Sequence, residues 1–460
     1  MGLQITTEQQ AMLPHHNAFP RPAYAWYVVA VLTLAAISAY IDRLILSLLV
    51  TPIKRDFILS DTEMSLLMGF SFALFYTLLG LPMGRWADSH SRKRIIMLGI
   101  ILWSVMTALS GIAKNYGHLF LARVGVGVGE AALFPAAYSM IADYFPKPRL
   151  ALAMSVFGMG IFIGAGLAMF INGLIVGLTA QATPLELPVV GTIFPWQKIF
   201  FVIGLPGLLV AALLLTVREP VRHGGLAGTT GVERTQYPMR AVLAYMRANK
   251  RTFLCHHLGF ALFALHNYAA NAWIPPFFMR TYGWEAAKVG TVYGPVIVVF
   301  GTLGILLGGY FTDWLARRGH VDAKLRTGLT AALALTPAII LYPLMPNGEA
   351  ALLALIPVNI FASFAFGAAT AAIQEVTPNQ MRAQVSALYL FVINLIGLGL
   401  GPTAVALITD FVFGDENCVR YSLIVVGTLA LLPAALLFWL GLKPYRRSLA
   451  NLQEQAAARH

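Results

Sequence analysis

Long apolar segments recur along the chain, separated by short polar stretches. By a rough count, twelve of them reach the ~20 residues that a helix needs to cross the hydrocarbon of a membrane. They begin near Tyr24, Glu63, Arg94, Gly117, Leu150, Gln197, Thr252, Ala286, Leu325, Ala350, Ala383 and Arg420. In "LSDTEM", Ser60 and Glu63 stand at capping-box spacing before the second segment. The pattern predicts an all-α polytopic membrane protein with twelve transmembrane helices.

The composition fits a chain that lies almost entirely within the membrane. Of its 460 residues, 58% are hydrophobic and only 11% are charged, whereas soluble domains carry about 25% charged residues. The mean hydropathy of +0.72 leaves no room for a large aqueous domain. The net charge of +12 does not by itself indicate nucleic-acid binding, because basic loops are expected on membrane proteins.

The distribution of the 32 Lys and Arg residues predicts the orientation. Most of them fall in loops on the same side as the N-terminus, which the positive-inside rule assigns to the cytoplasm. Both termini are therefore expected in the cytoplasm, with the protein in the inner membrane of the cell. The longest inner loop is rich in glycine and is expected to be a flexible hinge. The expected parts are an N-terminal cytoplasmic tail (1–23), an N-terminal six-helix bundle (24–217), a cytoplasmic linker (218–251), a C-terminal six-helix bundle (252–441) and a C-terminal cytoplasmic tail (442–460).

One loop motif occurs in each half of the chain. The second segment ends in "GRWADSHSRKR" and the eighth in "GYFTDWLARR". Both place a glycine, an aspartate and an arginine at the same spacing: Gly84, Asp88 and Arg92, and then Gly309, Asp313 and Arg317. Two parallel repeats indicate a known type of transporter architecture.

With these loops, the chain resembles the major facilitator superfamily over essentially its full length. It departs from the superfamily loop at Ser89 and Ser91, where a basic residue and a glycine are usual. A narrower resemblance is to the Spinster-like branch, whose members move lysophospholipids or sphingosine-1-phosphate. It rests on "YIDR" in the first helix, "LSDTEMSLL" in the second and "RVGVGVGEAALFPAAYSMIADYFP" in the fourth. The resemblance implies two pseudo-symmetric bundles that work by alternating access.

The repeated motif is expected to form the inner gate. Asp88 would dock on the positively polarised N-terminus of the eleventh helix, with Arg92 neutralising it. Asp313 would do the same against the fifth helix. The alternative is that the basic residues of these loops only enforce topology.

Four charged residues interrupt the first and fourth helices. Asp42 and Arg43 are adjacent, and Arg123 and Glu130 lie seven residues apart on one helix face. At 1.5 Å per residue, Arg123 and Glu130 bracket the other two in depth. Both helices line the central cavity of this fold, so a net-neutral cluster is expected. Asp42 is expected to be the main proton carrier with Glu130 as its alternate, and Arg43 and Arg123 to bind a phosphate. A static structural ion pair is the alternative.

The C-terminal half offers neutral polar groups in place of this cluster. His266, Asn267, Tyr268 and Asn359 are expected to contribute to substrate binding. Such an asymmetry suits an amphiphile whose head lies near helices one and four and whose tail lies along the apolar half. Pro275–Pro276 is expected to break the outer end of the seventh helix.

The sequence therefore predicts a monomeric secondary active transporter that moves a lysolipid-like amphiphile, with protons and membrane lipids as its other partners. The alternative within transport is a proton-driven exporter of drugs or small organic anions. No nucleotide-binding loop or nucleophile elbow appears in the sequence, so ATP-driven transport is not expected. A membrane enzyme acting on lipids is not expected either, because the sequence offers no paired nucleophile and base. Catalytic residues, metal sites, cofactors and nucleic-acid partners are likewise not expected. A receptor that binds a ligand without moving it is a further class to separate by experiment.

Overall fold

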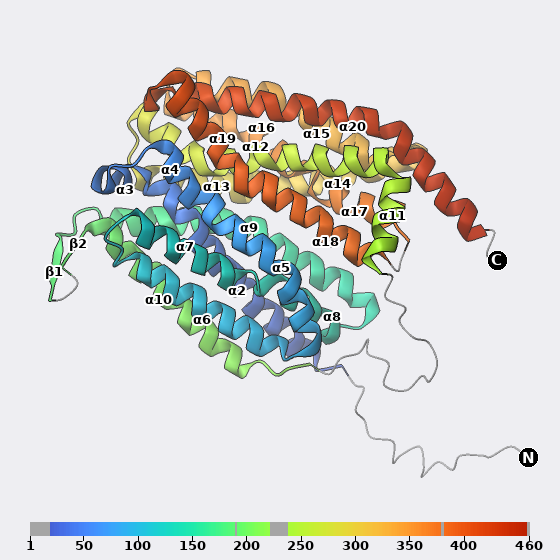
Figure 1. Cartoon of the computed structure of the whole chain (residues 1–460), viewed down its shortest axis with the longest axis horizontal. Coiled ribbons are helices and arrows are strands. Elements are labelled where there is room, and N and C mark those ends of the chain that lie inside the picture. The colour runs from blue at the N-terminus through green and yellow to red at the C-terminus, as the bar shows by residue number, and fades with distance from the viewer. Residues whose placement is uncertain (1–18, 189–190, 221–237, 379–380, 458–460) are drawn as a thin grey trace, which may run out of the picture.

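Two helical bundles lie side by side along the whole length of the molecule (Figure 1). The structure is a computed structural model, and it describes residues 19–188, 191–220, 238–378 and 381–457. The N-terminal bundle, blue to green, lies below the C-terminal bundle, yellow to red, in this view. The one small sheet in the described residues is an antiparallel pair, β1 (Leu185–Leu187) and β2 (Gly191–Ile193), which projects from the N-terminal bundle.

The N-terminal bundle crosses the membrane region six times. Its helices, in chain order, are α2 (Pro22–Leu48), α3 (Val50–Phe57), α4 (Asp61–Ser65), the π-helical turn η1 (Leu66–Phe70), α5 (Ser71–Ser89), α6 (Arg92–Ser110), α7 (Tyr116–Glu130), α8 (Leu133–Tyr144), α9 (Lys147–Thr179) and α10 (Pro195–Thr216). Two crossings are composite: one runs from α4 through η1 to α5, and the other from α7 to α8.

The C-terminal bundle follows α11 (Met239–Ala248) and also crosses six times. Its helices are α12 (Lys250–Tyr282), α13 (Ala286–Val296), η2 (Ile297–Gly301), α14 (Thr302–Arg317), α15 (Ala323–Leu341), η3 (Tyr342–Leu344), α16 (Gly348–Phe364), α17 (Phe366–Val376), α18 (Arg382–Ile393), η5 (Asn394–Leu400), α19 (Gly401–Leu407), η6 (Ile408–Phe413), η7 (Glu416–Cys418) and α20 (Val419–Ala457).

The predicted all-α fold with twelve crossings in two bundles is confirmed. Eleven helical segments of the described chain are long and apolar enough to cross a membrane. The twelfth crossing, α12, is 33 residues long but carries several His and Asn residues, which lower its hydropathy. All twelve predicted starting points lie within three residues of the observed ones. The capping box is also present, because the Ser60 hydroxyl accepts from the Glu63 amide while the Glu63 carboxylate accepts from the Ser60 amide.

The predicted break of the seventh helix at Pro275–Pro276 is wrong. Helix α12 continues through both prolines to Tyr282, and both are buried. A proline removes one backbone hydrogen bond, but a transmembrane helix tolerates this where neighbouring helices enclose it. The helix instead ends at Gly283, whose left-handed backbone (φ 66°) is the usual conformation of a residue that terminates a helix.

The molecule has two ends that differ in structure. Helix α2 begins and α20 finishes at the right of Figure 1, and we call this end the terminal face. Helices α3 and α4 and the β-hairpin lie at the opposite end, which we call the distal face. The expected linker, 218–251, is described at 218–220 and from 238 onward, where α11 lies at the terminal face.

Candidate functional site

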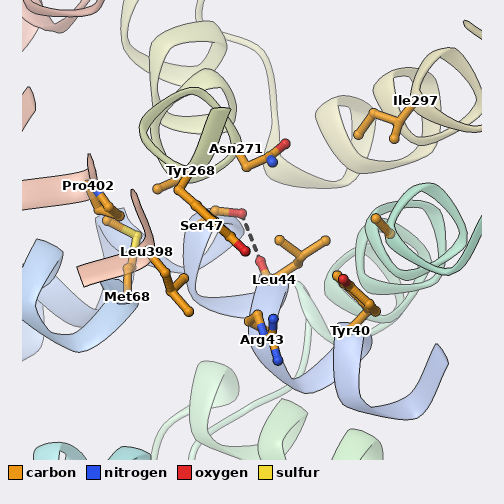
Figure 2. A pocket seen from close by; sticks show the side chains of 12 residues that line it. Tyr40, Arg43, Leu44, Ser47, Met68, Tyr268, Asn271, Ile297, Leu398 and Pro402 are labelled. Carbon is orange, nitrogen blue, oxygen red and sulfur yellow. Dashed lines mark hydrogen bonds between the residues drawn. The ribbon is translucent and has the colours of Figure 1, made fainter. Parts of the chain in front are cut away.

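A small cavity lies between the two bundles (Figure 2). Its volume is about 60 Å³, and both bundles contribute side chains to its wall. The residues that line it are Tyr40, Arg43, Leu44, Ser47, Met68, Ala165, Tyr268, Asn271, Ala272, Ile297, Leu398 and Pro402. Most of these side chains are apolar or aromatic, and Arg43 is the charged residue among them. A solute held here would contact both halves of the protein at once.

Arg43 is held in the wall by an acid and by aromatic rings. Its Nη2 donates to Oε2 of Glu130 over 2.5 Å, and its guanidinium carbon lies 4.4 Å from the centroid of the Phe72 ring. The rings of Tyr40 and Tyr76 lie at 5.2 and 5.3 Å. Such cation–π contacts stabilise a guanidinium that is largely removed from water. The Nε of Arg43 and Oε1 of Glu130 are buried without a hydrogen-bond partner among the described residues, so the pair retains unused bonding capacity.

Asp42 and Arg123 form the deeper part of the charge cluster. Asp42 is 1% exposed and is not part of the cavity wall. Adjacent residues project about 100° apart on a helix, so Arg43 faces the cavity while Asp42 faces α6 and α7. Arg123 donates from Nη1 to the backbone carbonyl of Asp42 over 3.1 Å. The predicted convergence of the four charged residues is therefore present, but only Arg43 reaches the cavity.

The cluster as a whole is buried and incompletely hydrogen-bonded. Neither carboxylate oxygen of Asp42, nor Nε or Nη2 of Arg123, has a hydrogen-bond partner of good geometry among the described residues. Removing charged groups from water is costly unless they are paired and fully bonded. An arrangement of two acids and two bases with spare donors and acceptors can therefore exchange partners when a proton or an anion arrives.

The four neutral residues expected from the C-terminal half lie in different places. Tyr268 lines the cavity. Asn267 instead donates to the carbonyl of Ala362 in α16 over 3.1 Å, and His266 lies beside Gly427 of α20. Asn359 donates to Leu355 of its own helix over 2.8 Å. Among these four residues, Tyr268 is thus the only one at the cavity wall. Sequence reasoning missed Asn271, which lies one helical turn after Asn267 and could have been found from that spacing.

A second group of charges joins the two bundles at the distal face. Asp61 of α4 has a fully buried side chain and accepts two hydrogen bonds from Arg280 of α12, over 2.6 and 2.7 Å. Lys54 lies 2.6 Å from Asp61 and 2.7 Å from Glu416, which precedes α20. We call Lys54, Asp61, Arg280 and Glu416 the distal clamp. Its bidentate arginine–carboxylate pair, with two parallel hydrogen bonds, is a strong type of ionic contact in proteins.

Hydrogen bonds extend this closure beside the distal clamp. Asp410 of η6 accepts from both the amide and the hydroxyl of Thr62, over 2.7 and 2.6 Å. Sequence reasoning did not assign a gate to any residue of the distal clamp. The available signal was that Asp61 lies in the capping-box segment and Arg280 near the end of its helix, but nothing in the sequence shows that the two ends meet.

The terminal face has ion pairs of a different kind. Arg92, 1% exposed, pairs with Asp143 and with Glu219, and these three residues belong to the N-terminal bundle. Burial raises the pKa of Glu219, but hydrogen bonds from the Lys93 amide, Arg92 and Ser91 outweigh it and hold that pKa below its usual value. These contacts do not cross to the other bundle.

The expected inner gate is not assembled at the residues that can be described. Asp313 is exposed and has no ion pair within the described chain, and Arg317 lies 5.8 Å from the ring of Tyr310. The Cβ position of Gly309 faces open space, and that of Gly84 approaches only Pro135, at 3.8 Å. The side chain of Asp88 lies outside the described residues. Arg92, which was expected to neutralise Asp88, is bonded within its own bundle.

Comparison with known proteins identifies the family. The sequence profile of the Major Facilitator Superfamily matches residues 32–402. The chain belongs to this superfamily. A relative from Mycolicibacterium smegmatis, described as an MFS-type efflux pump, is 30% identical over 450 residues, which are 97% of this chain and 99% of that protein. Protein spinster of Drosophila melanogaster is 26% identical over 300 residues, 64% of this chain and 46% of that protein.

A solved structure extends the likeness of this superfamily member to three dimensions. It is that of a bacterial homolog of the human lysosomal transporter Spinster, in an inward-facing and unoccupied conformation. The TM-score is 0.80 at 26% identity, covering 93% of this chain and 99% of that one. The expected Spinster-like resemblance is confirmed. These findings make the chain a multi-pass membrane transporter of the superfamily and not an enzyme.

Proposed function

We propose that this transporter moves an anionic amphiphile of the lysophospholipid or sphingosine-1-phosphate type and couples the movement to protons. The observation that carries the proposal is the Arg43–Glu130 pair, which places a guanidinium in the cavity wall with one carboxylate as its ionic partner among the described residues. The fork of an arginine matches two oxygens of a phosphate, so a phosphate head group could take the place of Glu130.

Proton coupling would follow from competition for Arg43. When Glu130 is protonated it loses its charge, and its attraction for Arg43 falls. Arg43 then becomes available to the substrate anion, while the deeper Asp42 and Arg123 keep the cluster near neutrality. We therefore assign Glu130 the direct exchange with substrate and retain Asp42 as a second proton site behind it. This reverses the order of importance expected from the sequence, because Glu130, and not Asp42, is the acid paired with Arg43.

An apolar tail would lie along the rest of the cavity wall. Leu44 and Met68 of the first bundle face Ile297 and Leu398 of the second. A cavity of about 60 Å³ is far smaller than the ~300–1,000 Å³ of typical ligand pockets. An amphiphile would enter only when the bundles separate. The distal clamp blocks separation at one end, so we propose that access is from the terminal face, as an inward-facing state requires if that face is cytoplasmic.

The orientation and location follow the same reasoning. We propose that the terminal face lies in the cytoplasm and that the protein acts as a monomer in the inner membrane. The support is the concentration of basic residues at that end, including Arg94, Arg247 and Lys250. A cysteine-accessibility experiment on intact cells tests it: Ser91→Cys should resist an impermeant reagent until the membrane is opened, whereas Asn417→Cys should react at once.

The alternative function is proton-driven export of drugs or small organic anions. Its support is the M. smegmatis relative, which is described as an efflux pump. Arg43 would bind a small carboxylate as well as a phosphate. The two functions differ in whether an acyl chain contributes to binding.

Ligand-induced thermal stabilisation of the purified protein tests the substrate. We expect lysophosphatidic acid to stabilise it in a saturable manner, a monoacylglycerol of the same chain to do so weakly, and glycerol 3-phosphate not at all. Arg43→Gln should raise at least tenfold the concentration of lysophosphatidic acid that gives half of the maximal stabilisation. The stabilisation by monoacylglycerol should stay unchanged. Equal losses for both lipids would mean that Arg43 serves structure. Stabilisation by small anions alone would favour the alternative.

Reconstitution into liposomes tests the proton assignment. Glu130→Gln should bind the lysolipid but should no longer transport it in response to a pH gradient. Asp42→Asn should keep part of that response. If Asp42→Asn abolishes the response and Glu130→Gln keeps it, the order expected from the sequence is the correct one, and the competition at Arg43 is not the coupling step.

A further inference from the structure

A second, larger hollow lies outside the central site and is lined by residues of α11, α12 and α18. Figure 1 shows α11 at the terminal face. Its volume is about 740 Å³, well within the range of ligand pockets. Its wall includes Arg240 and Arg247 of α11, Lys250, Leu254 and Leu258 of α12, and Val392 of α18. We call it the linker groove. All of these residues lie in the C-terminal half or in α11, so the groove does not depend on contact between the bundles.

The linker groove combines positive charge with exposed apolar surface. Arg240, Arg247 and Lys250 line it, none of the three forms an ion pair with a carboxylate of the described chain, and no acidic residue is part of the wall. Beside them, Leu254 is 56% exposed and Leu258 is 37% exposed. Helix α12 enters the membrane region at Lys250, so the charges stand at its start and the leucines follow one and two turns deeper. Basic pockets of this kind between transmembrane helices bind acidic lipid head groups.

We propose that the linker groove binds an acidic phospholipid of the surrounding membrane, with phosphatidylglycerol as the fitting example. The phosphate pairs with Arg240, Arg247 and Lys250. An acyl chain lies along Leu254, Leu258 and Val392 and covers their exposed surface. The lipid is a bound partner at the membrane interface and is distinct from the transported substrate.

Native mass spectrometry of the full-length protein with added lipids tests the proposal. Phosphatidylglycerol and phosphatidylmethanol carry the same negative charge, and both should be retained above phosphatidylcholine. Replacing Arg240, Arg247 and Lys250 together by Gln should weaken phosphatidylglycerol binding at least tenfold. The matched control replaces three exposed basic residues elsewhere at the terminal face, Arg94, Arg149 and Lys443, by Gln and should change it less than twofold. Equal losses in both triple variants would overturn the site.

The melting temperatures of the two triple variants without lipid, compared with that of the unaltered protein, show whether each is folded. If phosphatidylcholine binds the unaltered protein as tightly as phosphatidylglycerol does, the proposal is wrong.

Discussion

The two ends of the molecule use charged residues in opposite ways. At the distal face the ion pairs cross between bundles, as Asp61 of α4 does with Arg280 of α12. At the terminal face the described pairs stay within one bundle: Arg92 binds Asp143 in the first, and Lys324 binds Glu375 in the second. Pairs that cross hold a conformation, whereas pairs that stay within a bundle hold that bundle together in every conformation. The free energy that favours this state is therefore concentrated at the distal face.

Close backbone packing adds to the distal closure. Helices α9 and α13, one from each bundle, approach so closely that a Cβ placed on Gly290 would lie 2.5 Å from the Cα of Gly173. No side chain fits there, so two glycines permit a contact that any larger pair would prevent. Small residues serve the same purpose in other membrane helix pairs. The distal end is thus closed by both charge and shape.

The largest expected effect comes from removing the centre of the distal clamp. Asp61→Asn removes the bidentate partner of Arg280 and leaves it with the half-exposed Glu416 carboxylate at 3.2 Å, and breaking a buried pair costs up to about 3–5 kcal/mol. Even the lower figure changes the ratio of two states by roughly a hundredfold. We expect the distal face to open, which spin labels at Arg55 and Val412, both exposed, would report as a longer distance.

Glu349→Gln is the control for the distal clamp. Glu349 also forms an ion pair, with Lys288 over 3.1 Å, but both residues are exposed and belong to the C-terminal bundle. Exposed ion pairs contribute little to stability, because water and salt screen them. The distance between the spin labels at Arg55 and Val412 should therefore not change in Glu349→Gln. An unchanged distance in Asp61→Asn as well would mean that packing alone closes this end.

The next effect concerns the glycine contact. In Gly290→Ala the new methyl group meets backbone atoms that cannot rotate away, and overpacking of this kind costs about 1–3 kcal/mol. We expect a partial lengthening of the same label distance. Gly301→Ala is the matched control, since its Cβ would meet nothing within 4 Å. Similar distances in both variants would show that α9 and α13 can separate without effect on the distal face.

A smaller effect is expected at the terminal face, on stability and not on conformation. The pKa of Glu219 is lowered in the folded protein, so its charged form stabilises the fold above the unfolded pKa of about 4.3, and this contribution is lost as the pH falls through the folded value. Glu219→Gln should lower the free energy of unfolding by about 1 kcal/mol at pH 7. It should also flatten the acid side of the plot of melting temperature against pH. Glu454→Gln, exposed at the same end, should match the unaltered protein. A change in the distance between spin labels on the two bundles would contradict the view that the pair of Glu219 and Arg92 acts within one bundle.

The smallest effect in this conformation is expected from Asp88→Asn. Its predicted role is to dock on the eleventh helix when the terminal face closes. Because no ion pair of the described residues crosses between the bundles at this face, the variant has little of that contact to lose. Labels at Arg94 and Arg318 should therefore show the same main distance as the unaltered protein and a reduced minor population of the closed form. An unchanged minor population would leave this motif with a role in topology only.

Local patterns in the sequence predicted the fold and part of the candidate site. Apolar segment length gave the twelve crossings, because the thickness of the hydrocarbon sets that length directly. The spacing of Ser60 and Glu63 gave a helix cap, because both partners lie within one turn. The depth of Arg123 and Glu130 along their helix placed them near Arg43, because the rise per residue is fixed.

Which side of each helix faces the cavity was decided only by tertiary packing. Asp42 and Arg43 are neighbours, yet one is buried behind the cavity and the other lines it. In the same way, Asn267 bonds to a neighbouring helix while Tyr268 lines the cavity. Rotating their helix about its axis by a third of a turn would be enough to exchange these roles. An apolar stretch that is hydrophobic on all sides gives no periodicity from which that rotation could be deduced.

The sequence by itself determined the class of this protein, its crossings and the presence of a compensated charge cluster in the membrane, since each of these depends on residues close together in the chain or on a fixed geometry. The tertiary structure decided which arginine meets the cavity, which acid meets that arginine, and that Asp61 and Arg280 close the distal end. Those contacts join residues far apart in the chain, and their partners are chosen by how two whole bundles pack, which no local pattern of residues specifies.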